Sequence, residues 1–464
     1  MYLLSPDQGT DWKTVLPPNE CSYILGNPPF VGQTYQSEEQ KKDQAFVLAD
    51  LSAKGVLDFV CNWYVLAAQY IQGSGIRCAF VSTNSITQGE QVGILWSYLF
   101  SRYQVKIHFG FRTFPWSNEA AGKAAVHVVI VGFGYQSVAK KRIFESAPYS
   151  CQETPMSISP YLVIGSETVI GNRTTPLNDV PKMSWGNKPT DGGHFIMSPD
   201  ERRELLDREP QAAPLVRRYM GGGDFINDIV RYCLWLVDAD PALIRKCPTV
   251  LSRIEKVREF RLQSEAKSTQ AYASKPTLFR QIAQPNSAYL AIPEVSSENR
   301  DYIPMAFLDK DVICSNTLQF VPAATAYHFG ILTSCMHMAW VRTVCGRLKS
   351  DYRYSNSLVY NNYPWPEPSD NQREAIETAA QNVLDARKPH LAGGASLADL
   401  YSSAMPPALI TAHQALDRAV EKAYRPKPFI NDRERVEFLF ALYEKISSPL
   451  APTAGAKARG RKMA

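Results

Sequence analysis

A rigid polar turn is the first feature of this sequence whose residue types suggest chemistry. Asn27, Pro28, Pro29 and Phe30 follow a short apolar segment, residues 22–25, that predicts a β-strand. Ligands of open α/β sheets bind beyond the carboxyl ends of strands, which is where this turn would lie. Because proline fixes φ, the side-chain oxygen of Asn27 and the carbonyl of Pro28 could point at one spot.

Two acceptors aimed in this way suit the alkylation of an exocyclic amine on a nucleobase. The lone pair of such an amine is delocalised into the ring, so its nitrogen is a poor nucleophile. Acceptors for both N–H bonds would favour a tetrahedral nitrogen whose lone pair faces a methyl donor about 3–3.5 Å away. Phe30 would stack on the base, which must be flipped out of a duplex to reach the turn. The alternative is a structural turn with Asn27 facing solvent.

A second aromatic wall for the same base is predicted at Phe114. It stands in an aromatic segment, residues 111–116, just before an apolar strand predicted at residues 124–133. Trp116 competes with Phe114 for this role. The alternative for Phe114 is ordinary core packing.

The elements that must position these side chains alternate between strand and helix. Apolar runs predict strands at residues 22–25, 76–82, 105–109 and 124–133, and helical periodicity appears at residues 56–71 and 89–100. Such alternation favours an α/β sheet, here an incomplete Rossmann-like sheet, and we assign it residues 1–150.

The remaining chain divides at a turn-rich stretch between residues 150 and 190. Residues 151–368 predict a mixed α+β domain, with a basic helix at 251–262, strands at 289–295 and 317–321 and one helix at 329–345. Residues 369–450 predict a small helical unit, and residues 451–464 predict a disordered basic tail.

Composition narrows the class of protein without naming a function. The 464 residues carry a formal charge of +5, which permits a nucleic-acid partner but does not demand one. The nine cysteines and seven histidines show no metal-binding spacing, so no metal site is predicted. No apolar run approaches the ~20 residues of a membrane span, and a cytoplasmic protein is expected.

Several segments in a fixed order resemble the N6-adenine DNA methyltransferases, and most closely the MmeI-like restriction-modification enzymes. They are residues 27–32, 81–91, 125–129 and 360–366. The resemblance implies a methyltransferase core that uses S-adenosyl-L-methionine, a target-recognition domain that binds double-stranded DNA, and a helical C-terminal unit. It places Asn27, Pro28, Pro29 and Phe30 in the catalytic motif and Phe114 against the flipped base.

One part of the family's pattern does not match this sequence. Such enzymes bind the cofactor with a Gly-rich loop and an acidic residue, both upstream of the Asn-Pro-Pro motif, and neither feature occurs in residues 1–26. The cofactor-binding residues therefore stay unknown, and the site is expected to be incomplete. A truncated gene, a start site assigned too late, or a separate polypeptide that supplies the upstream half would each explain this. The family's nuclease is expected to be absent as well.

Sequence readout would need forked polar side chains in the second domain. If the segment at residues 293–304 is extended, Glu298 and Arg300 lie on one face and could read a single C·G pair. The alternative is a mutual surface ion pair. Further cations stand among aromatic residues and are candidates for phosphate contacts. They are Arg342, Arg347, Lys349 and Arg353.

A weaker phosphate-contact candidate is the basic helix at residues 251–262, which includes Arg258 and Arg261 but is partly neutralised by glutamates. Taken together, the sequence predicts a fragment of a site-specific DNA adenine N6-methyltransferase from a restriction-modification system. The first alternative is a DNA-binding remnant or specificity module without catalysis. The second is methylation of another planar amide or amine, such as a protein glutamine.

Overall fold

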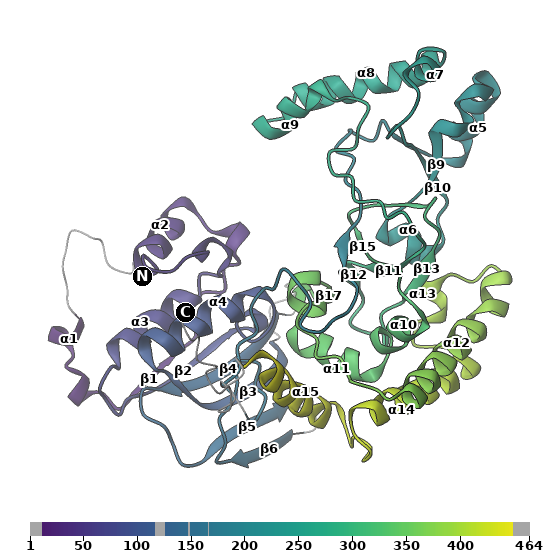
Figure 1. Cartoon of the computed structure of the whole chain (residues 1–464). Coiled ribbons are helices and arrows are strands. Elements are labelled where there is room, and N and C mark those ends of the chain that lie inside the picture. The colour runs from purple at the N-terminus through teal and green to yellow at the C-terminus, as the bar shows by residue number, and fades with distance from the viewer. Residues whose placement is uncertain (1–11, 117–125, 147–148, 166, 449–464) are drawn as a thin grey trace, which may run out of the picture.

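The computed structural model describes residues 12–116, 126–146, 149–165 and 167–448 (Figure 1). Its first unit is a six-stranded sheet with the order β1-β2-β4-β3-β5-β6. The strands are β1 Tyr23–Gly26, β2 Arg77–Thr83, β3 Lys106–Trp116, β4 Val126–Gly134, β5 Lys141–Ser146 and β6 Tyr149–Thr154. The expected α/β sheet is confirmed: β1 and β2 pair in parallel, and β4 runs antiparallel to β2. The tail predicted at residues 451–464 lies outside the described residues.

Large aromatic side chains hold the helices of the first unit on this sheet. Its helices are α1 Trp12–Val15, α2 Glu38–Val47, α3 Cys61–Tyr70 and α4 Glu90–Tyr103. Tyr64 of α3 stacks on Phe133 of β4 with ring centroids 5.3 Å apart, and Trp96 of α4 is fully buried. The helix predicted to begin at residue 56 begins at Cys61, because the backbone of Leu57 is extended and separates the short helical turn Lys54–Val56 from α3; the N–H of Asp58 bonds to a side-chain oxygen of Gln91.

The second unit is α+β, as expected, and contains three small sheets with the orders β14-β9-β10-β8, β13-β11-β15-β7 and β12-β17-β16. Its strands are β7 Ser184–Trp185, β8 Ile196–Met197, β9 Val216–Met220, β10 Arg231–Leu234, β11 Tyr289–Pro293, β12 Val295–Ser296, β13 Ala306–Leu308, β14 Ile313–Cys314, β15 Leu318–Pro322, β16 Gly346–Leu348 and β17 Asp351–Arg353. Its helices are α5 Pro199–Arg208, α6 Gly222–Asn227, α7 Pro241–Arg245, α8 Pro248–Leu262, α9 Lys267–Ala271, α10 Ala326–Leu332 and α11 Cys335–Val344.

The single helix predicted at residues 329–345 is wrong, because the chain forms two helices there. α10 ends at Leu332 and α11 begins at Cys335. The side chain of Ser334 accepts a hydrogen bond from the N–H of His337, so it caps α11 and replaces the backbone acceptor that a continuous helix would use.

Helices α5, α7, α8 and α9 form an arm that projects from the second unit (Figure 1). The arm has its own hydrophobic core, which includes Phe195, Leu205 and Phe279. Arg261 of α8 is fully buried, and its guanidinium donates to four backbone carbonyls at 2.7–2.9 Å. The carbonyls belong to Pro189, Thr190, Lys275 and Leu278. Arg261 therefore ties the arm together, and its interpretation as a phosphate contact is wrong.

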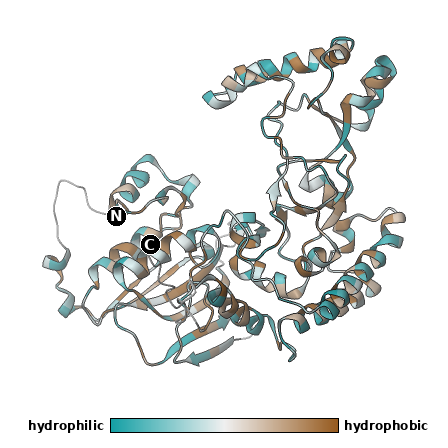
Figure 2. Ribbon diagram, viewed as in Figure 1, coloured by the Kyte–Doolittle hydropathy of each residue, from teal (hydrophilic) through white to brown (hydrophobic). Residues whose placement is uncertain are grey.

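The C-terminal unit is helical, as expected. Its helices are α12 Asp370–Ala392, α13 Leu397–Leu400, α14 Pro407–Tyr424 and α15 Asp432–Ser447. α12 and α14 alternate apolar and polar residues along their length, and in the first sheet the inner strands β2 and β4 are more apolar than the outer strands β5 and β6 (Figure 2). Phe440 of α15 contacts Tyr161, in the stretch that follows β6, and Trp340 of α11, so this helix packs against the second unit and the stretch that leads into it.

The described part of the chain contains no helix long and apolar enough to span a bilayer. Within the same residues, no group of three or more His, Cys, Asp or Glu side chains is arranged to hold a metal ion.

Candidate active site

The turn that carries Asn27 leaves the sheet at the end of β1. β1 pairs in parallel with β2, so the turn lies at the carboxyl edge shared by both strands. Pro28 is buried, Phe30 is half-buried and Asn27 is exposed. The amide of Asn27 makes no hydrogen bond with any residue that the structure describes, so its oxygen is available to a ligand. A side chain at Gly26 would come within 3.2 Å of the ring of Phe80, which explains the glycine before the motif.

On one side of the turn lies an apolar cavity of about 980 Å³ that runs along β1. Asn27, Pro28 and Pro29 line it together with aromatic residues such as Trp63 and Phe80. β1 is an edge strand of the described sheet, and two of its residues, Tyr23 and Leu25, are 63% and 74% exposed. The cavity therefore has an apolar wall that borders an open sheet edge.

This cavity does not fit an adenosyl cofactor by itself. A nucleoside cofactor in a doubly wound sheet lies where strands diverge on both sides, and an acidic side chain binds the ribose hydroxyls. No described strand pairs with β1 beyond β2, and no Asp or Glu is among the described residues that line the cavity. Within the described residues, β1 therefore has one paired edge and one open edge, and the open edge borders the cavity.

Phe114 lies at the same edge of the sheet as Asn27. Phe114 of β3 pairs with Val128 of β4, and Val128 pairs with Thr83 at the end of β2. Phe114 is half-buried and its ring meets that of Phe111 edge to face, with centroids 5.0 Å apart. Trp116 is more exposed and stands 6.2 Å from Phe114 between ring centroids. Both aromatic candidates are therefore at the edge where the turn ends.

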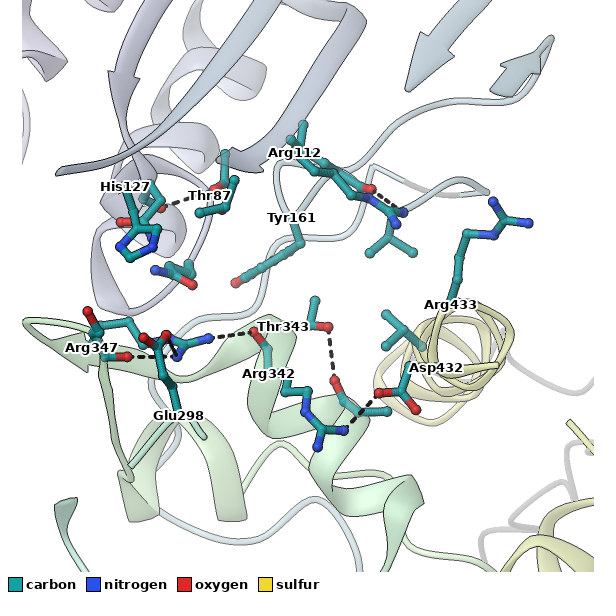
Figure 3. Close-up of a pocket in the computed structure, with 18 of the residues that line it drawn as sticks. Thr87, Arg112, His127, Tyr161, Glu298, Arg342, Thr343, Arg347, Asp432 and Arg433 are labelled. Atoms are coloured by element: carbon teal, nitrogen blue, oxygen red, sulfur yellow. Dashed lines mark hydrogen bonds and ion pairs between the residues drawn. The ribbon is translucent and has the colours of Figure 1, made fainter. Parts of the chain in front are cut away.

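On the other side of the turn, the first unit faces the second across two adjoining polar cavities. One has a volume of about 330 Å³ and is shown in Figure 3, and the other has a volume of about 650 Å³. Gln33, three residues after Phe30, lines the larger cavity. Both cavities are lined by Asn84 and Gln88 from the first unit and by Arg347 and Lys349 from the second. The turn thus lies between an apolar cavity and a polar cleft.

Most of the predicted phosphate-contact residues gather at this cleft, and three of them are held in ion pairs. Arg347 lies 3.6 Å from Glu298, Arg342 lies 2.8 Å from Asp432, and Arg353 lies 3.1 Å from Glu294. Figure 3 shows the first two pairs with Arg433 beside them. Lys349, in the turn between β16 and β17, is exposed and has no hydrogen-bond or ion-pair partner in the described part of the chain.

The extended geometry assumed for Glu298 and Arg300 is wrong. β12 ends at Ser296, and the chain then turns, with the N–H of Arg300 bonded to the carbonyl of Ser297. The hydroxyl of Ser297 and a carboxylate oxygen of Asp351 each accept a backbone N–H, from Asn299 and Glu298 respectively, and these bonds favour the turn. Glu298 pairs with Arg347, and Arg300 is half-buried without an ion pair to a described residue.

Sequence reasoning missed the polar residues that the first unit contributes to the cleft. Asn84, Thr87 and Gln88 follow the end of β2 and line the smaller cavity with His127 and Arg112. The run of polar residues just after a buried strand was a usable signal for the first three. No local signal identifies Arg112, because it comes from a different strand and reaches the cavity only through the fold.

Three models of one protein family match consecutive parts of the chain. They are the MmeI DNA-methyltransferase domain over residues 7–145, the MmeI target recognition domain over residues 164–367 and the MmeI C-terminal domain over residues 368–451. The chain belongs to the MmeI-like family. We therefore call its three units the methyltransferase unit, the target-recognition domain and the C-terminal domain.

Two proteins similar to this MmeI-like chain are longer than the part that it matches. DNA methyltransferase A of Bacillus subtilis (strain 168) is 40% identical over 441 residues, which are 94% of this chain and 49% of the relative. The solved structure of the type IIL restriction-modification enzyme MmeI in complex with DNA is 47% identical, with a TM-score of 0.85, and the match covers 95% of this chain and 59% of that one. The chain spans about half the length of the curated relative.

Proposed function

We propose that this chain is the target-base and sequence-recognition half of a site-specific DNA adenine N6-methyltransferase of a restriction-modification system. The observation that carries the proposal is the position of Asn27. Its amide oxygen, without a hydrogen bond to any described residue, lies beyond the edge strand at the apolar cavity along β1, and Gln33, six residues later, lines the polar cleft that faces the target-recognition domain. A base that enters from the cleft would meet Asn27 on the side where a methyl donor approaches.

In this proposal the residues of the turn act by positioning. The side-chain oxygen of Asn27 and the carbonyl of Pro28 accept the two N–H bonds of the adenine amine and direct its lone pair. Pro28 is buried and fixes the backbone, so little conformational entropy is lost when the base binds. Phe30 stacks on the flipped base, and Phe114 supplies the second aromatic contact.

The methyl donor in the proposal is S-adenosyl-L-methionine, held mainly by a part of the enzyme that the described residues do not include. That part would add a parallel strand to β1 and bring the acidic side chain that the described lining of the cavity lacks. The exposed Tyr23 and Leu25 on the edge strand β1 support this arrangement, as does the length of the curated relative.

A reconstitution experiment tests the proposal. The chain is mixed with the portion of Bacillus subtilis DNA methyltransferase A that it does not match, labelled S-adenosylmethionine and a duplex of random sequence, and the methylated nucleosides are identified by mass spectrometry. N6-methyladenine that needs both polypeptides supports the proposal. Sequence-selective DNA binding without methyl transfer would favour the alternative of a specificity module, which the open cofactor cavity also favours. If the mixture neither methylates DNA nor binds it sequence-selectively, both the proposal and the specificity-module alternative are wrong.

Replacement of Lys349 with alanine should weaken DNA binding by a similar factor on every duplex sequence. Lys349 lines the cleft and has no partner among the described residues, so its loss removes one phosphate contact. The slope of the logarithm of the binding constant against the logarithm of the salt concentration then falls by about one. Binding titrations at four salt concentrations measure that slope. Lys388→Ala is the control, because Lys388 is paired with Asp385 on α12. An unchanged slope in Lys349→Ala would exclude this phosphate contact.

A further inference from the structure

The turn after β12 is held firmly at its first residues. We call residues 297–302 the recognition segment, because it contains Glu298 and Arg300. The carboxylate of Glu298 pairs with Arg347, and the guanidinium of Arg347 lies over the ring of Tyr352 at 4.0 Å. A carboxylate oxygen of Asp351 accepts the N–H of Glu298 at 3.3 Å. This end is therefore fixed by the β16–β17 hairpin of the target-recognition domain itself.

The other end of the recognition segment is held by a different domain. The hydroxyl of Tyr302 donates to Asp417 of α14 at 2.6 Å. The ring of Tyr302 also stacks on that of His413, one turn earlier on α14, with centroids 4.0 Å apart and an angle of 14° between the rings. Burial and the neighbouring Asp417 raise the pKa of Tyr302, so its hydroxyl keeps the proton that it donates.

A second contact at the same end is oriented by the C-terminal domain. Arg342 of α11, within the target-recognition domain, donates to the carbonyl of Asp301 at 3.2 Å and to Asp432 of α15 at 2.8 Å. Asp432 thus sets the direction of the guanidinium that holds the segment. Because Asp432 also accepts from Arg435, its carboxylate is itself fixed within α15.

The residues of α14 that hold Tyr302 are themselves immobilised. His413 is fully buried, and its Nε2 lies 2.8 Å from the hydroxyl of Tyr401. Burial lowers the pKa of His413 to about 3, which keeps the stacked imidazole neutral. The second carboxylate oxygen of Asp417 accepts the N–H of Cys335 at the start of α11. The segment is thus attached to a rigid framework of helices and not to a mobile surface.

Between its two fixed ends, the recognition segment presents one cation without a partner. The guanidinium of Arg300 forms no hydrogen bond or ion pair with the residues that the structure describes; burial lowers its pKa, and the nearby Asp351 opposes this shift. A forked donor discriminates between base edges only if its backbone is placed to within about 0.5 Å. The contacts at both ends supply that placement.

We propose that the C-terminal domain sets sequence specificity: Tyr302 with Asp417, and Arg342 with Asp432, are positioning residues for the readout of one base pair by the recognition segment. The inference rests on the proposed function in requiring sequence-selective DNA binding, but it does not require methyl transfer. It assigns to the helices of the C-terminal domain a role in choosing the DNA sequence.

The experiment compares the DNA sequences selected by the full chain and its variants from a library of random duplexes. Tyr302→Phe keeps the stacked ring and removes the hydrogen bond to Asp417. Its matched control is Tyr424→Phe, also a half-buried tyrosine whose hydroxyl bonds to Tyr363 and to the carbonyl of Pro364, away from the recognition segment. Asp432→Asn tests the second contact in a more exposed position. Melting temperature and affinity for non-selected DNA are measured for each.

We expect Tyr302→Phe to prefer the favoured base at one position about tenfold less strongly than the unaltered chain does. Its base preferences at the other positions and its affinity for non-selected DNA should stay unchanged. Asp432→Asn should relax the same position, and Tyr424→Phe should relax none. Equal sequence preferences in Tyr302→Phe and the unaltered chain, or a loss spread evenly over all positions, would overturn the inference. If Tyr302→Phe does not fold, Asp432→Asn decides between these outcomes. A starting chain that selects no sequence would instead contradict the proposed function.

Discussion

Replacing Asn27 with alanine should lower the rate of methyl transfer in the reconstituted enzyme by about two to three orders of magnitude, comparable to losing one oriented hydrogen-bonding group at a reacting centre. Alanine removes the acceptor that holds the amine while leaving Pro28 and Pro29 to maintain the turn. DNA affinity should change little, because Asn27 lines the apolar cavity and not the polar cleft. Single-turnover rates with saturating DNA and cofactor isolate the chemical step.

The control for this variant is Asn19→Ala. Asn19 is also an exposed asparagine of the methyltransferase unit, and it lies in the short helical turn Pro18–Glu20 before β1. Its replacement should leave the rate within about twofold, since surface substitutions of this kind change free energies by no more than ~0.5 kcal/mol. Retention of most methyl transfer in Asn27→Ala would show that the turn is structural and would remove the central element of the proposed mechanism.

Replacing Arg261 with methionine should unfold the arm of the target-recognition domain locally. Four buried carbonyls would lose a charged donor. At about 1 kcal/mol for each hydrogen bond, the free energy of unfolding of the arm should fall by an amount on the order of 4 kcal/mol. The arm has a separate hydrophobic core, so the effect should stay within it. Hydrogen exchange of backbone amides measures this directly: those of the arm should exchange much faster in Arg261→Met, while those of the methyltransferase unit should be unchanged.

Arg258→Met is the matched control on the same helix. The side chain of Arg258 is 54% exposed and pairs only with Glu255, 3.6 Å away, so its loss should change local stability by less than about 0.5 kcal/mol. If the backbone amides of the arm exchange at the same rate in Arg261→Met and Arg258→Met, the buried guanidinium does not stabilise the arm. The interpretation of α8 as a phosphate contact would then need to be considered again.

Prediction from sequence succeeded where the signal was local. β1, β2 and α4 follow from short apolar runs and helical periodicity, and Asn27 could be placed at a strand end because the turn lies directly after that strand. The order of strands was not predictable, because the antiparallel return of β4 between β2 and β3 depends on which edges pair.

The errors arose where distant residues decide the local conformation. Glu298 turns away from an extended path partly because Asp351, far along the chain, accepts its N–H. Arg261 has the sequence context of a surface cation, yet carbonyls from two separate loops surround it. Neither partner is visible in a window around the residue, so charge patterning alone assigned both side chains to solvent or DNA.

The open edge of β1 has a further consequence. Among the described residues only β2 pairs with β1, so Tyr23 and Leu25 lie in water on an edge that any other strand could pair with, including β1 of a second copy. Under the proposed function, the part of the enzyme that completes the cofactor site would also cover this edge. One contact would then serve both catalysis and solubility.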